Sequence, residues 1–445
     1  MVYLTVAIIF IASSVYPILG AGQSAHIMIS SQGTISPKLS ALHTDGKYIK
    51  DELGNVVLLR GVCLYEVPSY VDHLKYNKPI TAYVARLKEL GINYVRLPVN
   101  KPDWDVNNDT NGDGIGARDF NYQVIDAFTK AGIYVFVGLM YGVSSSEEQS
   151  WAANPQIVID WYINNIINRY QNNKGVNIYV WNEPHYGVWG GSNLGGGITS
   201  GYWNAMKAIC QALHEANPNL LIIVHADTWT SAGFSRVLQT DPIPTPNVIY
   251  TWHYYYCYAP TYNPYLGWMT GVSDPDYQEL VNRGMPFYQS YYYGNYTQAR
   301  QEFEKWLYDN YLWVPTELNL TIVNDEFGFT GDEEPYFSYR ACKECGWYGH
   351  VTDTLDAPDG NHVQQPYPNV TYCPICGAAL PRPREHVEPG WPQCMRDLIE
   401  IMEKYYCSWN YFAWWTKTYA GYGLTLDDMT TLSQTGLVLK DCLSG

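Results

Sequence analysis

The stretch NIYVWNEP, residues 177–184, has the pattern of a buried strand that ends abruptly in polar residues. Its first five residues suit the interior of a sheet, whereas Asn182 and Glu183 follow at once and Pro184 cannot continue a ladder. A carboxylate at the edge of an apolar core is costly to desolvate unless another group binds it. The stretch therefore predicts a strand whose carboxyl end carries functional side chains.

Similar apolar runs recur along the chain from about residue 46. With residues 177–183 they are 56–62, 92–99, 133–141, 220–226, 247–255, 321–328 and 410–416. Amphipathic stretches with helical spacing lie between them, at 81–90, 121–131, 156–171, 201–216, 297–309 and 392–406. Apolar strands that alternate with helices indicate a parallel sheet covered by helices. Eight repeats predict an α/β fold, a (β/α)₈ TIM barrel.

Functional side chains of such a barrel lie at the carboxyl ends of its strands. Polar or aromatic residues fall at five predicted strand ends, namely Arg96, Asn182 with Glu183, His253 with Tyr255, Glu326, and Trp415. Glu183 and Glu326 belong to the fourth and seventh strands, which we expect to face each other across the mouth. Two carboxylates in this arrangement suit hydrolysis of a glycosidic bond with retention. The alternative is that each only pairs with a nearby base, as Glu326 could with Arg96.

Five motifs resemble glycoside hydrolase family 5, the cellulase and mannanase family of the larger retaining barrel clan. They are RGV at 60–62, LKELGINYVRLPV at 87–99, WNEP at 181–184, HYY at 253–255 and NDEFG at 324–328. The resemblance covers roughly residues 46–335 and resumes at 392–443. It implies Glu183 as the acid/base and Glu326 as the nucleophile, with no cofactor for catalysis.

The same resemblance implies roles for the neighbouring residues. Asn182 would hold the sugar 2-hydroxyl, while Arg96 and Tyr255 would hydrogen-bond the nucleophile. His253 would contact the sugar or tune the acid/base. Trp415 would stack beneath the sugar ring, with Trp414 as the alternative, because strand parity is ambiguous by one residue.

Two features depart from the family pattern or compete with it. The third strand ends in VGLMYG, without the histidine that many members carry, and this leaves the substrate open. Glu317, in VPTELN, is a second candidate nucleophile, but it lacks the Phe-Gly that follows Glu326.

The tyrosine-rich segment 254–296 suits either stacking on a polysaccharide or packing of a long loop.

Two Cys-x-x-Cys-Gly motifs, at 342–346 and 373–377, have the pattern of a four-thiolate structural zinc site. The predicted ligands are Cys342, Cys345, Cys373 and Cys376. Disulfides are the alternative for an exported protein. We expect residues 338–390 to form a zinc-ribbon insertion after the seventh strand, with the metal supplying its folding energy. The other six cysteines are scattered, and Cys63 and Cys210 are expected in the core.

The stretch DTNGDGIGARD, residues 109–119, resembles a calcium-binding loop. Asp109, Asn111 and Asp113 are the candidate ligands, but Phe120 stands where the terminal acid belongs. A solvated polar loop is the alternative.

Composition narrows the class of partner. The 445 residues carry a net charge of −16, which argues against a nucleic-acid partner. Only 16% are charged and 15% are aromatic, including 41 Tyr and 16 Trp, which suits a packed globule with an aromatic-lined cleft. We expect the catalytic barrel at residues 46–337 and 391–445.

The first 37 residues contain no Asp, Glu, Lys or Arg, and residues 2–20 form an apolar run. Residues 1–25 are predicted to be a signal peptide or an uncleaved membrane anchor, followed by an extension at 26–45. The protein is thus expected to be secreted and extracellular, or anchored at the cell surface. Sequons at Asn108, Asn295, Asn319 and Asn369 are compatible with export.

Together these patterns predict a secreted, retaining endo-β-glycanase. A β-1,4-linked glucan such as cellulose is the first expected substrate and mannan the second. The rival hypothesis is a catalytically silent carbohydrate-binding or cell-surface interaction protein. The presence of both Glu183 and Glu326 argues against it, because a binding module needs neither.

Overall fold

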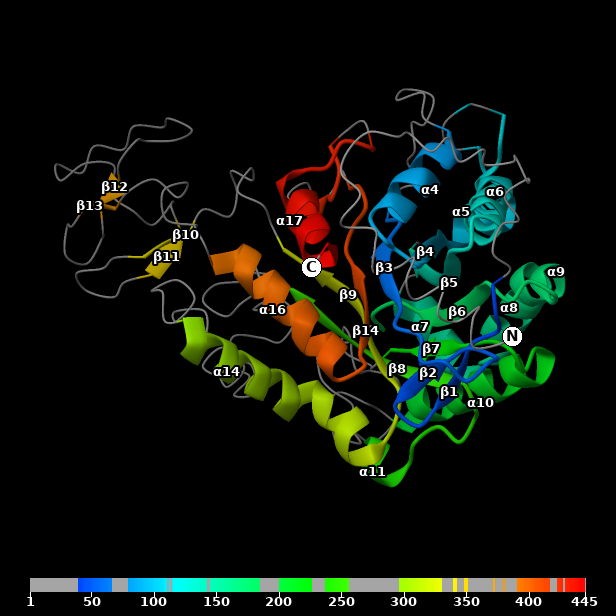
Figure 1. Cartoon of the computed structure of the whole chain (residues 1–445). Helices are drawn as coiled ribbons and strands as arrows, with labels where there is room; N and C mark the ends of the chain where they lie inside the picture. Colours follow the sequence, from blue (N-terminus) through cyan, green and yellow to red (C-terminus); the bar gives the residue numbers. More distant parts are fainter. Residues whose placement is uncertain are drawn as a thin grey trace, which may run out of the picture. The chain divides into compact units, whose positions relative to one another are not determined.

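Eight parallel strands close into a barrel in the computed structural model (Figure 1), so the predicted (β/α)₈ architecture is confirmed. In ring order they are β14 (Ser408–Tyr411), β3 (Arg60–Cys63), β4 (Tyr94–Asn100), β5 (Tyr134–Tyr141), β6 (Val176–Trp181), β7 (Ile222–Val224), β8 (Val248–Tyr255) and β9 (Ile322–Gly328). Each predicted apolar run contributes one strand.

The structure describes residues 39–65, 79–109, 112, 114–141, 145–184, 200–225, 237–255, 296–329, 339–341, 348–350, 371–372, 379–380, 390–416, 422–426 and 429–444. The chain divides into two units, Met1–Ser36 and Pro37–Gly445, and every described residue belongs to the second. The predicted leader and the tyrosine-rich residues 256–295 lie outside these ranges. No helix within them is long and apolar enough to cross a membrane.

Helices follow the strands as the sequence pattern predicts. They are α4 (Ile80–Glu89), α6 (Ala117–Lys130), α8 (Gln156–Tyr162) continued by η1 (Ile163–Ile167) and α9 (Asn168–Tyr170), α10 (Ser200–Ala216), α14 (Tyr296–Leu307) continued by η3 (Tyr308–Leu312) and η4 (Val314–Leu318), and α16 (Gly390–Lys404). The pair α14 and α16 lie side by side (Figure 1), and Arg300 forms an ion pair with buried Asp397 between them.

Among the described residues, four further helices were not predicted: α5 (Lys101–Val106), α7 (Ser145–Ala153), α11 (Val237–Thr240) and α17 (Gln434–Leu443). End caps rather than long apolar periodicity define two of them. The Asn100 side chain accepts from the Asp103 amide at the start of α5, and the Ser433 hydroxyl accepts from the Gly436 amide at the start of α17.

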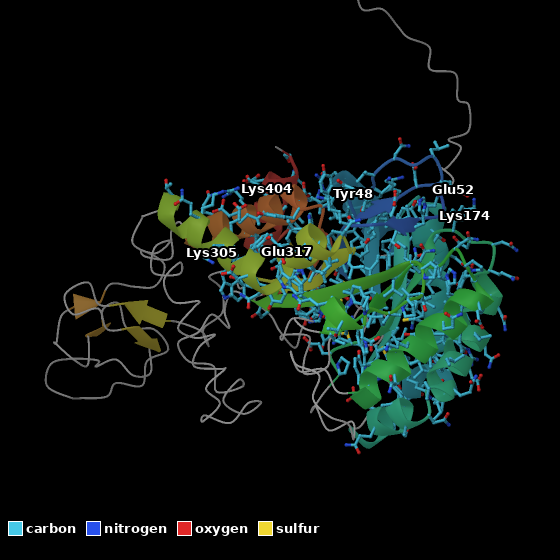
Figure 2. All side chains as sticks on the ribbon, turned by 90° about the horizontal axis from the view of Figure 1, so that it is seen from below. Tyr48, Glu52, Lys174, Lys305, Glu317 and Lys404 are labelled. Carbon is cyan, nitrogen blue, oxygen red and sulfur yellow. The ribbon has the colours of Figure 1, made fainter. Side chains whose placement is uncertain are left out.

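An N-terminal hairpin, β1 (His43–Asp45) with β2 (Tyr48–Lys50), lies at the amino-terminal ends of the strands. The Thr44 amide donates to Asn247 Oδ1 just before β8, at 3.0 Å. Beyond the hairpin, Glu52 forms an ion pair with Lys174 just before β6 (Figure 2). The hairpin spans the boundary expected at residue 46, with β1 before it and β2 after it.

The barrel interior near the amino-terminal ends of the strands is apolar and aromatic. Leu42 and Ile49 of the hairpin region belong to one buried cluster with side chains from seven barrel strands or the residues adjoining them: Leu59, Tyr94, Tyr134, Phe136, Tyr179, Leu221, Ile223, Ile249 and Val323. The first barrel strand also begins later than predicted. Val57 instead donates to Ile49 of the hairpin, at 2.8 Å. The filled interior leaves the carboxyl ends of the strands as the polar end of the barrel.

Candidate active site

A buried arginine connects the two strands that carry the predicted carboxylates. Arg96 of β4 is fully buried, and its guanidinium forms an ion pair with Glu326 of β9. A second nitrogen donates to Asn182 Oδ1 beyond β6, and Nε lies 3.2 Å from Asp325 Oδ2. The guanidinium also lies 4.2 Å from the ring centroid of Tyr179. One cation therefore ties β4, β6 and β9 together at this end of the barrel.

The two glutamates lie close together but differ in exposure. The Glu183 side chain is 19% exposed, whereas that of Glu326 is 4% exposed. One carboxylate oxygen of each lies within 4.8 Å of the other and of a ring nitrogen of His253. The backbone of Glu183 has a φ of 40°, a left-handed conformation that is strained for a residue with a side chain. The strain therefore lies at the more exposed of the two glutamates.

Two histidines link Glu183 to Asp325. His253 Nδ1 lies 2.7 Å from Glu183 Oε1, and its Nε2 lies 2.9 Å from Asp325 Oδ1. His225, next to β7, has Nε2 at 2.9 Å from Asp325 Oδ2, and its Nδ1 accepts from the Glu183 amide at 3.4 Å. Thr251 donates its hydroxyl proton to Asp325. All of these except Glu183 are buried.

His225, Thr251 and Asp325 are the residues of this cluster that our sequence interpretation did not single out. A signal was available for His225 and Asp325. His225 is the penultimate residue of the predicted strand 220–226, and Asp325 stands inside the quoted motif NDEFG. Each is a polar residue within an apolar strand run, where burial without a partner is costly.

Burial and charge set different ionisation states for these neighbours. Burial lowers the pKa of His225 to about 4, so this ring is neutral at neutral pH. Burial also acts against charge on His253, but the Glu326 carboxylate and the hydrogen bonds to Asp325 and Glu183 raise its pKa to about 10. Burial opposes the charge of Asp325 as well, yet Arg96 and the two histidines hold its pKa well below the usual range. Asp325 therefore lies between a neutral imidazole, that of His225, and a charged one, that of His253.

Comparison with known families assigns the chain. The model of "Cellulase (glycosyl hydrolase family 5)" matches residues 52–354, more than half of the protein. This chain belongs to glycoside hydrolase family 5. It is accordingly a glycoside hydrolase. Comparison of the sequence with curated proteins gives no match.

Solved structures share the barrel of this family 5 chain. A cellotetraose complex of an endocellulase variant from Pyrococcus horikoshii has 17% identity and a TM-score of 0.56, over 92% of this chain and 100% of the other. The catalytic domain of the major endoglucanase of Xanthomonas campestris pv. campestris has 16% identity and a TM-score of 0.55, over 90% and 99%. That of a Thermobifida fusca endoglucanase has 13% identity and a TM-score of 0.52, over 91% and 97%. At these identities the likeness establishes the fold alone.

The other residues predicted for this family 5 site lie in different places relative to the glutamate pair. Glu317 is exposed in η4, before the start of β9, and accepts from the Tyr308 hydroxyl at 3.0 Å, so it lies away from the cluster. The eighth strand ends at Tyr411, so Trp415 lies beyond it rather than closing it. Trp415 is 6% exposed, whereas Trp414 is fully buried. The side chain of Tyr255 lies outside the described residues.

The predicted metal ligands are described only in part. Asp109 accepts from the amides of Gly112 and Gly114, at 2.7 and 2.9 Å, as in a tight polar loop. Asn111 and Asp113 lie outside the described residues, as do the four cysteines of the predicted zinc site. The calcium loop stays a prediction. Five further cysteines, among them buried Cys63 and Cys210, are free thiols.

We expect acid to destabilise this enzyme partly through His225. The unfolded chain binds a proton there below about pH 6.5, whereas the folded ring stays neutral down to about pH 4. The folded pKa is depressed, so the unfolded state binds more protons in this window and the free energy of unfolding falls as pH falls. The two values correspond to roughly 3 kcal/mol. The raised pKa of His253 acts only above its unfolded value, outside this window.

Replacing His225 by Gln should remove this contribution. Urea unfolding at about pH 7 and about pH 4.5 should show a smaller loss of stability for the variant than for the wild type. An equal loss in the two proteins would contradict the assignment of a neutral, buried imidazole.

Proposed function

We propose that this family 5 protein is a retaining endo-β-glycanase that hydrolyses β-1,4-linked polysaccharide. The observation that carries the proposal is the pair Glu183 and Glu326, with carboxylate oxygens within 4.8 Å of each other. Retaining enzymes hold their carboxyl groups about 5–5.5 Å apart, whereas inverting enzymes leave room for a water at about 6.5–9.5 Å.

The environments of the two glutamates support different roles. Glu326 is buried and ion-paired with Arg96, so it is suited to remain ionised and to attack the anomeric carbon as nucleophile. Glu183 is the more exposed and would give its proton to the leaving oxygen as the glycosidic bond breaks. In the second half of the reaction Glu183 would take a proton from water, and that water would attack the anomeric carbon and release Glu326.

Asn182 is held in a way that suits sugar recognition. Its Oδ1 accepts from Arg96, which leaves its amide hydrogens to donate. A donor next to Glu183 suits the 2-hydroxyl of the sugar bonded to the nucleophile, where a hydrogen bond strengthens in the transition state. Trp415 is the more exposed of the two candidate stacking tryptophans.

The substrate proposal is a β-glucan first and a mannan second. It is supported by the cellulase family match and by the barrel shared with an endocellulase solved with cellotetraose. Purified protein should release reducing ends from soluble β-glucan, mannan or xylan, and a rapid fall in viscosity would identify endo action. Proton NMR of the first product should show the β anomer. Net inversion would overturn the retaining mechanism, and inactivity on the whole panel would favour a silent binding protein.

We propose that the enzyme acts outside the cell, because residues 2–20 form an apolar run and the first 37 residues contain no Asp, Glu, Lys or Arg.

We also propose that residues 338–390 form a structural zinc ribbon. Each Cys-x-x-Cys-Gly motif connects the two strands of a short antiparallel hairpin. The first hairpin is β10 (Tyr339–Ala341) with β11 (Tyr348–His350), and the second is β12 (Thr371–Tyr372) with β13 (Ala379–Leu380). Both connections span the same number of residues, 342–347 and 373–378. Two matched hairpins of this kind suit a closed four-thiolate site.

Cys373→Ser should remove bound zinc and lower thermal stability. The chemical step should survive, because no ligand position of a four-thiolate site is open to substrate. Elemental analysis and thermal unfolding of the purified variant check this expectation. Cys442→Ser, a half-buried free thiol in α17, is the matched control and should keep the metal. A zinc-free wild type whose four cysteines form two disulfides would refute the ribbon.

A further inference from the structure

Asp325 is a buried carboxylate of the site with four side-chain partners. Its side chain is 0% exposed, and it stands one residue before the proposed nucleophile. Cationic or neutral donors reach it from three strand ends, namely Arg96 Nε at 3.2 Å, His225 Nε2 at 2.9 Å, His253 Nε2 at 2.9 Å and the Thr251 hydroxyl. So many contacts to one buried carboxylate indicate a role beyond filling the interior.

Both histidines that contact Asp325 lead on to Glu183. His253 reaches the Glu183 carboxylate through its other nitrogen, at 2.7 Å from Oε1. His225 reaches the Glu183 backbone, because its Nδ1 accepts from the amide at 3.4 Å. That amide belongs to the residue whose φ is 40°. Asp325 is therefore linked to Glu183 at both the side chain and the strained main chain.

The hydrogen-bond partners fix the hydrogens on both rings. Asp325 can only accept, so Nε2 of His253 carries a proton. Nδ1 of His225 accepts from the Glu183 amide, so this neutral ring carries its proton on Nε2, 2.9 Å from Asp325 Oδ2. A charged His253 donates from Nδ1 to Oε1 of Glu183, so the transferable proton of Glu183 must sit on Oε2. A neutral His253 would instead accept from Oε1 and draw that proton away from the substrate.

We propose that Asp325 is a positioning residue that keeps His253 charged and fixes the Glu183 backbone through His225, so that Glu183 presents its proton to the leaving group. The role rests on the proposed function of Glu183 as acid/base. It assigns a part in the reaction to the residue before the nucleophile and to the histidine beyond β7.

Several charged or titratable groups face His253. They are Glu183 after β6, His225 after β7, and Asp325 and Glu326 on β9, while Arg96 of β4 pairs with the last two. His225 is neutral near pH 7 and adds no charge. In the proposed reaction Glu183 gains and loses a proton and Glu326 forms an ester. Asp325 takes part in neither step and stays ionised at every pH at which the enzyme would work. Glu326 does most to raise the pKa of His253, and Asp325 adds to it through a hydrogen bond and its charge, so removing the charge of Asp325 should lower that pKa.

The first test needs no activity. In the wild type, ¹⁵N NMR should show His253 protonated on both nitrogens up to about pH 8 and His225 protonated on Nε2 alone. In Asp325→Asn, which keeps the shape of the side chain, His253 should titrate at lower pH. Variants that lack either histidine assign the signals. A wild-type His253 that is neutral at about pH 7, or one that titrates identically in the variant, would overturn the proposal.

The second test separates positioning from folding. Asp325→Asn should lower kcat/KM about 10- to 100-fold on β-glucan, where departure needs a proton, and change it little on a dinitrophenyl β-cellobioside, where it does not. Thr321→Val is the matched control. It removes a part-buried hydrogen bond of 2.7 Å to the Gly46 carbonyl, just before the other end of β9, and the variant should show no dependence on the leaving group. Equal losses of Asp325→Asn on both substrates would overturn the role. If the wild type cleaves neither substrate, the proposed function fails while the NMR test still decides the ionisation.

Discussion

Glu326→Gln should abolish turnover on every glycoside, with kcat/KM lowered roughly 10⁴-fold or more. The amide cannot form a glycosyl ester, so the first half of the reaction has no nucleophile whatever the leaving group. Initial rates on β-glucan and on a dinitrophenyl β-cellobioside check this expectation, because both should fall together. The protein should stay folded, because Arg96 keeps its contacts with Asp325 and Asn182.

The matched control for this substitution is Glu317→Gln. Glu317 is exposed before the amino-terminal end of β9, so its amide variant should keep wild-type rates. Loss of activity in Glu317→Gln together with survival in Glu326→Gln would show that the nucleophile is misassigned. Thermal unfolding of both variants separates loss of the nucleophile from loss of the fold.

Glu183→Gln should show a deficiency that depends on the leaving group. On β-glucan the loss should be about 10²- to 10⁴-fold, because the departing alkoxide is not protonated. On a dinitrophenyl glycoside kcat/KM should change little, because the leaving group departs as a stable anion. Its kcat should still fall, because water in the second half of the reaction has lost its general base.

Azide provides the decisive measurement for this variant. As an anion it needs no general base, so it should restore kcat of Glu183→Gln on the activated substrate and yield a β-glycosyl azide. The wild type and Glu52→Gln, an exposed glutamate paired with Lys174 near the other end of the barrel, should not respond. An α-glycosyl azide, or no rescue, would contradict the role of Glu183 as the acid/base of a retaining mechanism.

The carboxylate pair could be predicted from sequence because each member follows a clear local signal. Asn182 and Glu183 end an apolar strand before a proline, and Glu326 stands in a motif on the seventh strand. A parallel barrel brings all strand ends of one polarity to one rim, so strand order alone predicts that they converge. The aromatic partner follows no such local signal, because β14 ends at Tyr411 and the following residues no longer alternate as a regular strand.

The sequence by itself determined the eight strands, their parallel order and which end of the barrel carries charge, since these follow from apolar periodicity and chain direction. Only the tertiary structure decided how Asp325 and Glu326 both reach Arg96. Between β8 and β9 the register shifts from Thr251 opposite Val323 to His253 opposite Glu326, an irregularity that gives β9 one residue more. Regular alternation would turn one of two adjacent carboxylates away from the interior, and a bulge removes that constraint. The sequence of β9 alone does not predict such a shift, because the register is a property of the pairing between β8 and β9.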